Sequence, residues 1–149
     1  DLGGQWLVVG TGDSVRVELA DPRARARPVA SVAIASGSLS TSGQSERGVT
    51  VDGARIGHVL DPRTGQPARD FGSLTVWAET ALAADCLSTG LYVLGPDSAF
   101  AWAARTSGVD VVVLEPTPAR LEVRATPGIA ARITAIAPEA RVDGPRTSD

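Results

Sequence analysis

The first half of the chain alternates hydrophobic and polar residues in short runs, which is the pattern of β-strands. Glycine, aspartate and proline separate these runs and predict turns between them. Further along, GVTVDGARIGHVL at residues 48–60 has the form of a hairpin that turns at Asp52-Gly53. The strand-like runs outside this hairpin are WLVVG (6–10), SVRVEL (14–19), VASVAIAS (29–36) and SLTVWA (73–78).

Two alanine-rich segments follow the strand at residues 73–78, and each predicts a helix. The first predicts a helix over about residues 79–94 that ends at Gly95-Pro96, and the second predicts a helix over about residues 97–106. A closing hairpin is expected from VDVVVLE and RLEVRA, which flank the turn PTPA. Strands with a pair of helices inserted between them favour an α+β domain. In it, the alanine-rich pair packs on a largely antiparallel sheet.

The end of the chain is polar and contains prolines. We therefore expect a domain at residues 1–135 and a loosely ordered tail at residues 136–149.

Composition indicates a globular domain with a core of its own: 43% of the 149 residues are hydrophobic and the mean hydropathy is +0.06. The net charge is −3, and the cluster Arg23, Arg25, Arg27 is too short to bind nucleic acid and is expected to be a solvated turn. The apolar runs are far shorter than the roughly 20 residues of a transmembrane helix. Cys86 is the only cysteine, so it forms no intrachain disulfide, and we expect it to be a small buried residue.

Spacing singles out one face of the first helix. Asp85, Ser88 and Thr89 stand at positions i, i+3 and i+4, so their oxygens share a face. Hard cations such as Mg²⁺ bind carboxylate and neutral oxygens, so this face can be a metal site. The alternative is an ordinary polar helix face, in which Ser88 and Thr89 bond back to helix carbonyls.

The only histidine, His58, lies in the stretch GHVLDPRTGQP at residues 57–67. Its prolines and glycine predict a tight loop, in which Asp61 bonds to nearby backbone and Arg63 is solvated. Loops on a rigid scaffold also tend to carry chemistry, and histidine transfers protons near neutral pH. A structural and a functional interpretation of this loop therefore both stand.

Four blocks of residues resemble the ApbE family of flavin transferases, once described as thiamine biosynthesis lipoproteins. HVLDPRTGQP is similar to the family signature H-x-x-D-P-x-T-G-x-P, and LTVWAETALAADCLSTGLYVLG is similar to the strand and A-D-x-x-x-T helix that follow it. DLGGQWLVVG resembles an earlier Gly-Gly strand, and SVAIASG with SERG resembles a serine-rich segment before the histidine. The blocks keep the family order from residue 1 to about residue 126.

The resemblance implies transfer of FMN from FAD to a threonine of a target flavoprotein through a phosphoester, with release of AMP and a requirement for Mg²⁺. By position, Asp85 and Thr89 match the family's magnesium ligands, and Ser88 lies beside them as a helper. His58 matches a histidine near the flavin and pyrophosphate, acting as a base or only as a contact, and Val59 matches a backbone contact to FAD. An FAD pyrophosphatase and a non-catalytic, flavin-binding or structural remnant of the family are the alternatives.

Members of the family are about twice as long as this chain. The resemblance therefore implies the C-terminal half of a larger two-lobed fold, with a K-G segment and much of the FAD pocket before residue 1. On this basis the chain alone is expected to be incomplete and inactive. Family habit also implies an extracytoplasmic, membrane-anchored lipoprotein.

Overall fold

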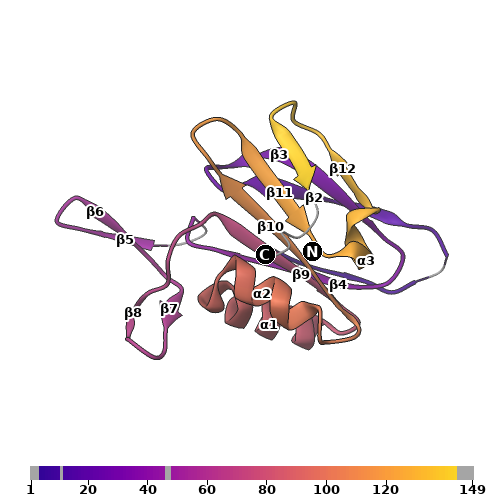
Figure 1. Ribbon diagram of the computed structural model, residues 1–149, viewed down its shortest axis with the longest axis horizontal. Coiled ribbons are helices and arrows are strands. Elements are labelled where there is room, and N and C mark those ends of the chain that lie inside the picture. Colours follow the sequence, from indigo (N-terminus) through magenta and orange to yellow (C-terminus); the bar gives the residue numbers. More distant parts are fainter. Residues whose placement is uncertain (1–3, 11, 46–47, 144–149) are drawn as a thin grey trace.

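A computed structural model describes residues 4–10, 12–45 and 48–143. Its centre is a six-stranded sheet with strand order β1-β4-β9-β10-β11-β13, and the helices α1 and α2 cover one face of it (Figure 1). Neighbouring strands run antiparallel except β11 and β13, which are parallel. The strands are β1 (Gln5–Val8), β4 (Gly37–Gly43), β9 (Ser73–Ala78), β10 (Val109–Pro116), β11 (Leu121–Ala125) and β13 (Ala140–Asp143).

A second, three-stranded sheet covers the opposite face, with the order β12-β3-β2. It consists of β2 (Val15–Asp21), β3 (Ala24–Ile34) and β12 (Ile133–Ala135), all antiparallel. The arginine cluster lies at the β2–β3 turn, where it is half exposed as expected but also paired. The buried Asp21 carboxylate accepts hydrogen bonds from the Arg23 backbone and guanidinium and from Arg27.

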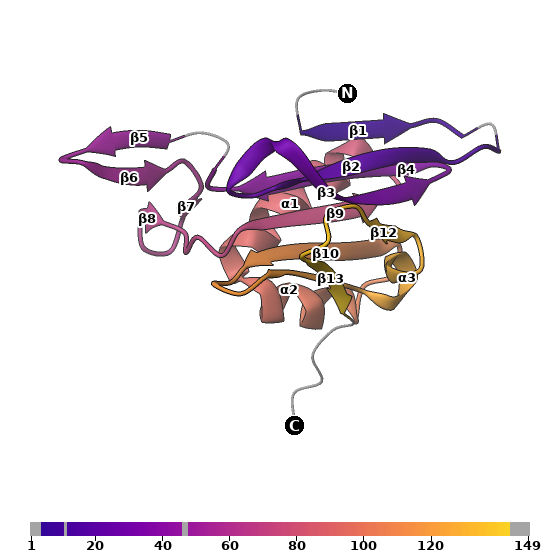
Figure 2. The same ribbon diagram turned by 90° about the horizontal axis from the view of Figure 1, so that it is seen from above.

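The predicted hairpin at residues 48–60 projects away from both sheets (Figure 2). Its strands are β5 (Gly48–Val51) and β6 (Ala54–Gly57), and the turn is at Asp52-Gly53, as predicted. Both turn residues have positive φ, 49° and 79°, which a type I′ turn requires. The loop that follows is closed by the short pair β7 (Leu60–Asp61) and β8 (Gln66–Pro67).

Helix α1 spans Ala81–Leu94, within two residues of the prediction. The Thr80 hydroxyl caps its first turn by accepting from the Ala83 N–H at 3.2 Å, and Gly95 ends it with φ of 86°. Helix α2 spans Pro96–Ala103, with proline in the first turn, so it starts one residue earlier and ends three residues earlier than predicted. The short helix α3 (Pro127–Ala130) was not predicted. No described helix is both long and apolar enough to cross a membrane.

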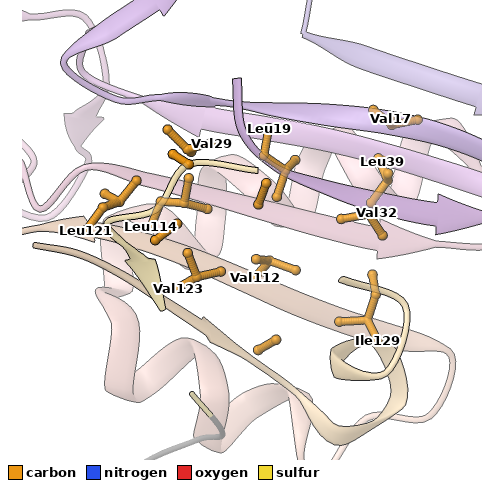
Figure 3. Close-up of a cluster of buried hydrophobic side chains, with 14 of the residues drawn as sticks. Val17, Leu19, Val29, Val32, Leu39, Val112, Leu114, Leu121, Val123 and Ile129 are labelled. Carbon is orange, nitrogen blue, oxygen red and sulfur yellow. The ribbon is translucent and has the colours of Figure 1, made fainter. Parts of the chain in front are cut away.

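Strand β10 joins the two halves of the core, because its neighbouring side chains point to opposite faces of the sheet. Val112 and Leu114 pack against the three-stranded sheet, among the side chains drawn in Figure 3. Val111 and Val113 pack under the helices. All four are fully buried, which explains the unbroken hydrophobic run in this part of the sequence.

The segment expected to be a loosely ordered tail is ordered over part of its length. Residues 140–143 form β13, which pairs with β11 in the large sheet, and Ala137 and Ala140 are buried. Small alanines give a weak hydrophobic signal, and the pairing of β13 is with a distant strand, so the local pattern did not indicate it. Residues 144–149 lie outside the described part of the chain.

Candidate functional site

Three serines form a polar seam between β4 and α1. Ser38, Ser40 and Ser42 alternate along β4, so all three side chains point toward the helix, and all three are buried. The Ser38 hydroxyl donates to the Trp6 carbonyl at 2.7 Å. The hydroxyls of Ser40 and Ser42 contact side chains of α1, so the polar face of the helix packs against this seam.

The structure brings together the three helix residues singled out from the sequence. Ser40 donates to the Asp85 Oδ1 at 3.4 Å. The Ser42 hydroxyl lies 3.0 Å from the Ser88 Oγ and 3.2 Å from the Thr89 Oγ1. The sequence pattern indicates a serine-rich segment but not the role of these three residues, for which serines at every second position of a strand are the available signal.

Asp85, Ser88 and Thr89 differ in their access to solvent. Ser88 is fully buried, and its hydroxyl lies 3.0 Å from the Asp85 carbonyl, the back-bonding that was the alternative to a metal site. Asp85 and Thr89 are exposed at the edge of the seam. The exposed carboxylate and hydroxyl are therefore the atoms that a bound ion can reach, while Ser88 supports them from inside.

The donor set suits a hard cation. No three His, Cys, Asp or Glu side chains gather into a metal site among the described residues. Asp85 and Thr89 supply one carboxylate and one hydroxyl, so an ion held here needs further oxygens from elsewhere. Mg²⁺ commonly uses one or two protein carboxylates and completes its shell with water and substrate phosphates, so these two residues fit it.

Cys86, expected to be buried, is exposed. Residue 86 lies one turn after Leu82, which is 75% exposed, on the side of α1 that faces away from the sheet. The buried side of the helix instead carries Ala84, Ser88, Leu91 and Tyr92. The angular position on the helix, not the hydrophobicity of the side chain, decides burial here.

The loop after His58 is tightly tied by local bonds, as predicted. The Asp61 carboxylate accepts from the Arg63 N–H at 2.9 Å, and the Arg63 guanidinium reaches both carboxylate oxygens. These side-chain and backbone bonds from Arg63 lower the pKa of Asp61. Arg63, expected to be only solvated, is thus paired with Asp61, and His58 itself is exposed.

Backbone atoms of Val59 are held by a side chain that sequence reasoning missed. The Val59 N–H donates to the Gln44 Oε1 at 3.0 Å, and the Val59 carbonyl accepts from the Gln44 Nε2 at 2.8 Å. The Val59 side chain is also buried. The Val59 backbone, which the family resemblance assigns to contacts with FAD, therefore has both its N–H and its carbonyl engaged inside the protein. No local pattern pointed to Gln44, because its partners lie 15 or more residues away.

The far end of the same loop is anchored to α1. The Phe71 and Tyr92 rings stack at 4.5 Å between centroids, and the Tyr92 hydroxyl donates to the Asp70 Oδ1 at 3.3 Å. Burial raises the pKa of the Tyr92 hydroxyl, and the negative charge of Asp70 raises it further. Val59, Phe71 and Tyr92 belong to one hydrophobic cluster, so the loop of His58 and the helix of Asp85 form one packed unit.

A separate cleft of about 660 Å³ lies on the other face of the large sheet, toward the three-stranded sheet. It is lined by Arg16, Glu18 and Asp21 and by Thr41 and Thr75, whose hydroxyls lie 2.8 Å apart. None of the site residues predicted from the sequence lines this cleft. Thr41 alternates with Ser40 and Ser42 on β4, so the sheet separates the cleft from the serine seam.

Known proteins similar to this chain are flavin transferases. A FAD:protein FMN transferase from Treponema pallidum is 34% identical over 146 residues, which cover 89% of this chain and 40% of that protein. Another, from Klebsiella pneumoniae, is 45% identical over 92 residues, covering 60% of this chain and 26% of that protein. The crystal structure of an ApbE protein from Thermotoga maritima superposes with a TM-score of 0.68 at 34% identity, covering 76% of this chain and 38% of the other.

The α+β fold with its mostly antiparallel sheet is confirmed, and it matches part of a larger fold in these neighbours. The chain spans less than half the length of each of these relatives. The model of the ApbE family matches residues 1–113, which is most of the sequence and includes every candidate site residue. The chain belongs to the ApbE family.

Proposed function

We propose that the full-length protein carrying this chain is a Mg²⁺-dependent FAD:protein FMN transferase, which moves FMN from FAD to a threonine of a target flavoprotein. The names of the similar proteins from Treponema pallidum and Klebsiella pneumoniae support the activity. One observation assigns the metal site to particular residues in this proposal. Asp85 and Thr89 lie exposed on one face of α1, and buried serines of β4 hold them from below.

In the proposed reaction, the threonine oxygen forms a bond to the FMN phosphorus and the bond to the bridging oxygen of the pyrophosphate breaks. AMP leaves with that oxygen, and the hydroxyl proton passes to a base. A Mg²⁺ ion bound at this site would supply positive charge to neutralise the phosphates and the leaving oxygen. Asp85 and Thr89 would hold the ion. Ser40 and Ser42 keep both side chains in place through the hydrogen bonds they make on the buried side.

His58 is the residue we propose to face the pyrophosphate from the loop. It is exposed, so a substrate can reach its side chain, while its two neighbours in sequence are held in the protein. As a base, His58 would take the threonine proton; as a contact, it would only orient the phosphates. Water in place of the threonine would give the alternative activity, hydrolysis of FAD to FMN and AMP.

Replacing Asp85 with asparagine in the full-length protein tests the proposal. This change keeps the shape of the side chain and removes its charge, so we expect FMN transfer to fall by about a hundredfold or more. Transfer is measured as flavin fluorescence bound covalently to the target, together with AMP release. Glu79→Gln is the matched control, because it removes an exposed carboxylate just before α1, and its activity should be unchanged.

Two results would contradict this assignment. Transfer rates that do not change across a magnesium titration would remove the metal from the mechanism. AMP release by the wild-type protein without covalent flavin on any threonine-bearing target would favour the hydrolase instead.

A further inference from the structure

Gln44 follows directly after β4 and is 4% exposed, although glutamine is a polar residue that is seldom buried. A primary amide has two N–H donors and one carbonyl oxygen that need partners when water is excluded. In Gln44 all of them are engaged. Its Nε2 donates to the Val59 carbonyl at 2.8 Å and to the Ala68 carbonyl at 2.9 Å, and its Oε1 accepts from the Val59 N–H at 3.0 Å.

These three bonds join the two ends of the loop at residues 59–68, which directly follows His58. Val59 lies at its start and Ala68 at its end, and the Ala68 N–H also donates to the Val59 carbonyl at 2.9 Å. Asparagine is one methylene shorter and cannot span the same distance. Glutamate has the length, but its carboxylate would place a negatively charged oxygen against the carbonyl oxygens of Val59 and Ala68, which repel it. Only the glutamine side chain satisfies this arrangement.

The residue before His58 is fitted to the same amide. A Cβ built on Gly57 would overlap the Gln44 carboxamide group. Gly57 has no left-handed φ, so glycine is required here for space and not for backbone conformation. Gln44 therefore packs against the residue on one side of His58 and hydrogen-bonds the residue on the other side.

Gln44 also meets the helix of the candidate metal site. Its backbone lies close enough to the hydroxyl of Tyr92, on α1, to counteract part of the rise in the pKa of that hydroxyl. Asp70 and Phe71, at the end of the loop, contact the same tyrosine. Gln44 thus lies between the loop that follows His58 and helix α1, which carries Asp85 and Thr89.

We propose that Gln44 is a positioning residue of the flavin transferase, one that fixes the Val59 peptide and through it the place of His58 relative to α1. This inference rests on the function proposed above. Gln44 is buried beneath the loop and acts through His58, not by contact with the reacting atoms.

The first test needs neither FAD nor metal. In Gln44→Ala, the exchange rate of the Val59 amide proton should rise at least about tenfold, because its acceptor is lost. The NMR signals of the ring of His58, the only histidine of this chain, should shift as well. Gln66→Ala makes the same chemical change at an exposed position of the same loop and should alter neither. An unchanged Val59 exchange rate would overturn the proposal.

A double-mutant cycle tests the contact with Gly57. Gly57→Ala alone should speed Val59 exchange, because the added methyl group displaces the Gln44 amide. In the Gln44→Ala background the same substitution meets no amide and should add little. If the two changes instead add fully, Gly57 does not act through Gln44 and the linkage is wrong.

The functional test uses the full-length protein. Gln44→Ala and Gln44→Glu should raise the Kd for FAD, or lower turnover at saturating FAD, by about tenfold to a hundredfold. The affinity for Mn²⁺, used as a probe of the α1 site and measured by calorimetry, should stay unchanged, because Ser40 and Ser42 support that site. Gln66→Ala is again the control.

The outcomes separate this inference from the proposed function. A wild-type protein that neither binds FAD nor transfers FMN would refute the function, while the exchange data would still report on the loop. An active wild type with equally active Gln44 variants would refute the positioning role. An equal loss of Mn²⁺ affinity in those variants would also refute it, since the effect would then be general.

Discussion

His58 is an exposed side chain on a backbone that is fixed on both sides. Gly57 packs on the Gln44 amide, and the Val59 peptide is hydrogen-bonded to it. These contacts to the residues on either side hold the backbone at His58, so its Cα has a fixed place. Such an arrangement suits a group that meets a substrate from a fixed position.

Replacing His58 with asparagine in the full-length protein should separate binding from proton transfer. If the imidazole accepts the threonine proton, turnover at saturating FAD should fall by about a hundredfold or more, with a much smaller change in the Kd for FAD. Steady-state rates at several FAD concentrations and a fluorescence titration give the two quantities. Weaker FAD binding with turnover at saturation preserved would make His58 a binding contact only.

Spacing along the sequence was enough to group Asp85, Ser88 and Thr89, because a helix repeats every 3.6 residues. It did not tell which of the three is buried, since that depends on how far α1 is rotated against β4. Gln44 was out of reach for a stronger reason. Its hydrogen-bond partners are 15 and 24 residues away, and nothing in the local sequence marks a buried glutamine.

The sequence of α1 defines both ends of the helix clearly, but it contains a residue of low helix propensity in the interior. The Thr80 cap and Gly95 set its limits, and both are visible in the sequence. Gly90, however, lies inside the helix, is exposed, and has open space where a Cβ would be. Glycine in a helix interior costs about 0.5–1 kcal/mol relative to alanine. The helix therefore contains a site at which stability can be gained.

Gly90→Ala should raise the free energy of unfolding by about 0.5–1 kcal/mol, since it restricts the unfolded chain and introduces no clash. Urea unfolding followed by circular dichroism measures the change. Gly95→Ala is the matched control with the opposite sign, because its φ of 86° is unfavourable for alanine although no atom lies in the way. Equal changes in the free energy of unfolding for the two substitutions would show that backbone conformation does not determine the effect of replacing these glycines.

At the scale of the whole molecule, local patterns predicted most strands but not their order. The run at residues 109–115 indicated a buried strand, and the structure shows why, since β10 has packed side chains on both faces. Pairings such as β1 with β4, or β13 with β11, join segments far apart in sequence. Long-range pairing is decided by which faces bury each other, which a single sequence does not encode locally. This is also why β13 was missed.

The shared strand predicts that both halves of the core unfold together. Leu121 is fully buried on the side of the three-stranded sheet, and Leu121→Ala should lower the free energy of unfolding by about 2–5 kcal/mol. Trp102, on α2, is partly buried and packs against the other cluster. Strand β10 contributes Val112 and Leu114 to one cluster and Val111 and Val113 to the other. The fluorescence of Trp102 should therefore show the same loss of stability.

Fluorescence of Trp102 isolates the distant cluster when Trp6 and Trp77, which pack on the opposite side, are replaced with phenylalanine. In this background, Leu121→Ala should move the urea midpoint of Trp102 fluorescence and that of the far-ultraviolet circular dichroism by the same amount. Leu82→Ala, at a position 75% exposed, should change the free energy of unfolding measured by either probe by no more than about 0.5 kcal/mol. A Trp102 transition that stays in place while the circular dichroism shifts would mean that the helix layer, with the candidate site on it, folds independently of the three-stranded sheet.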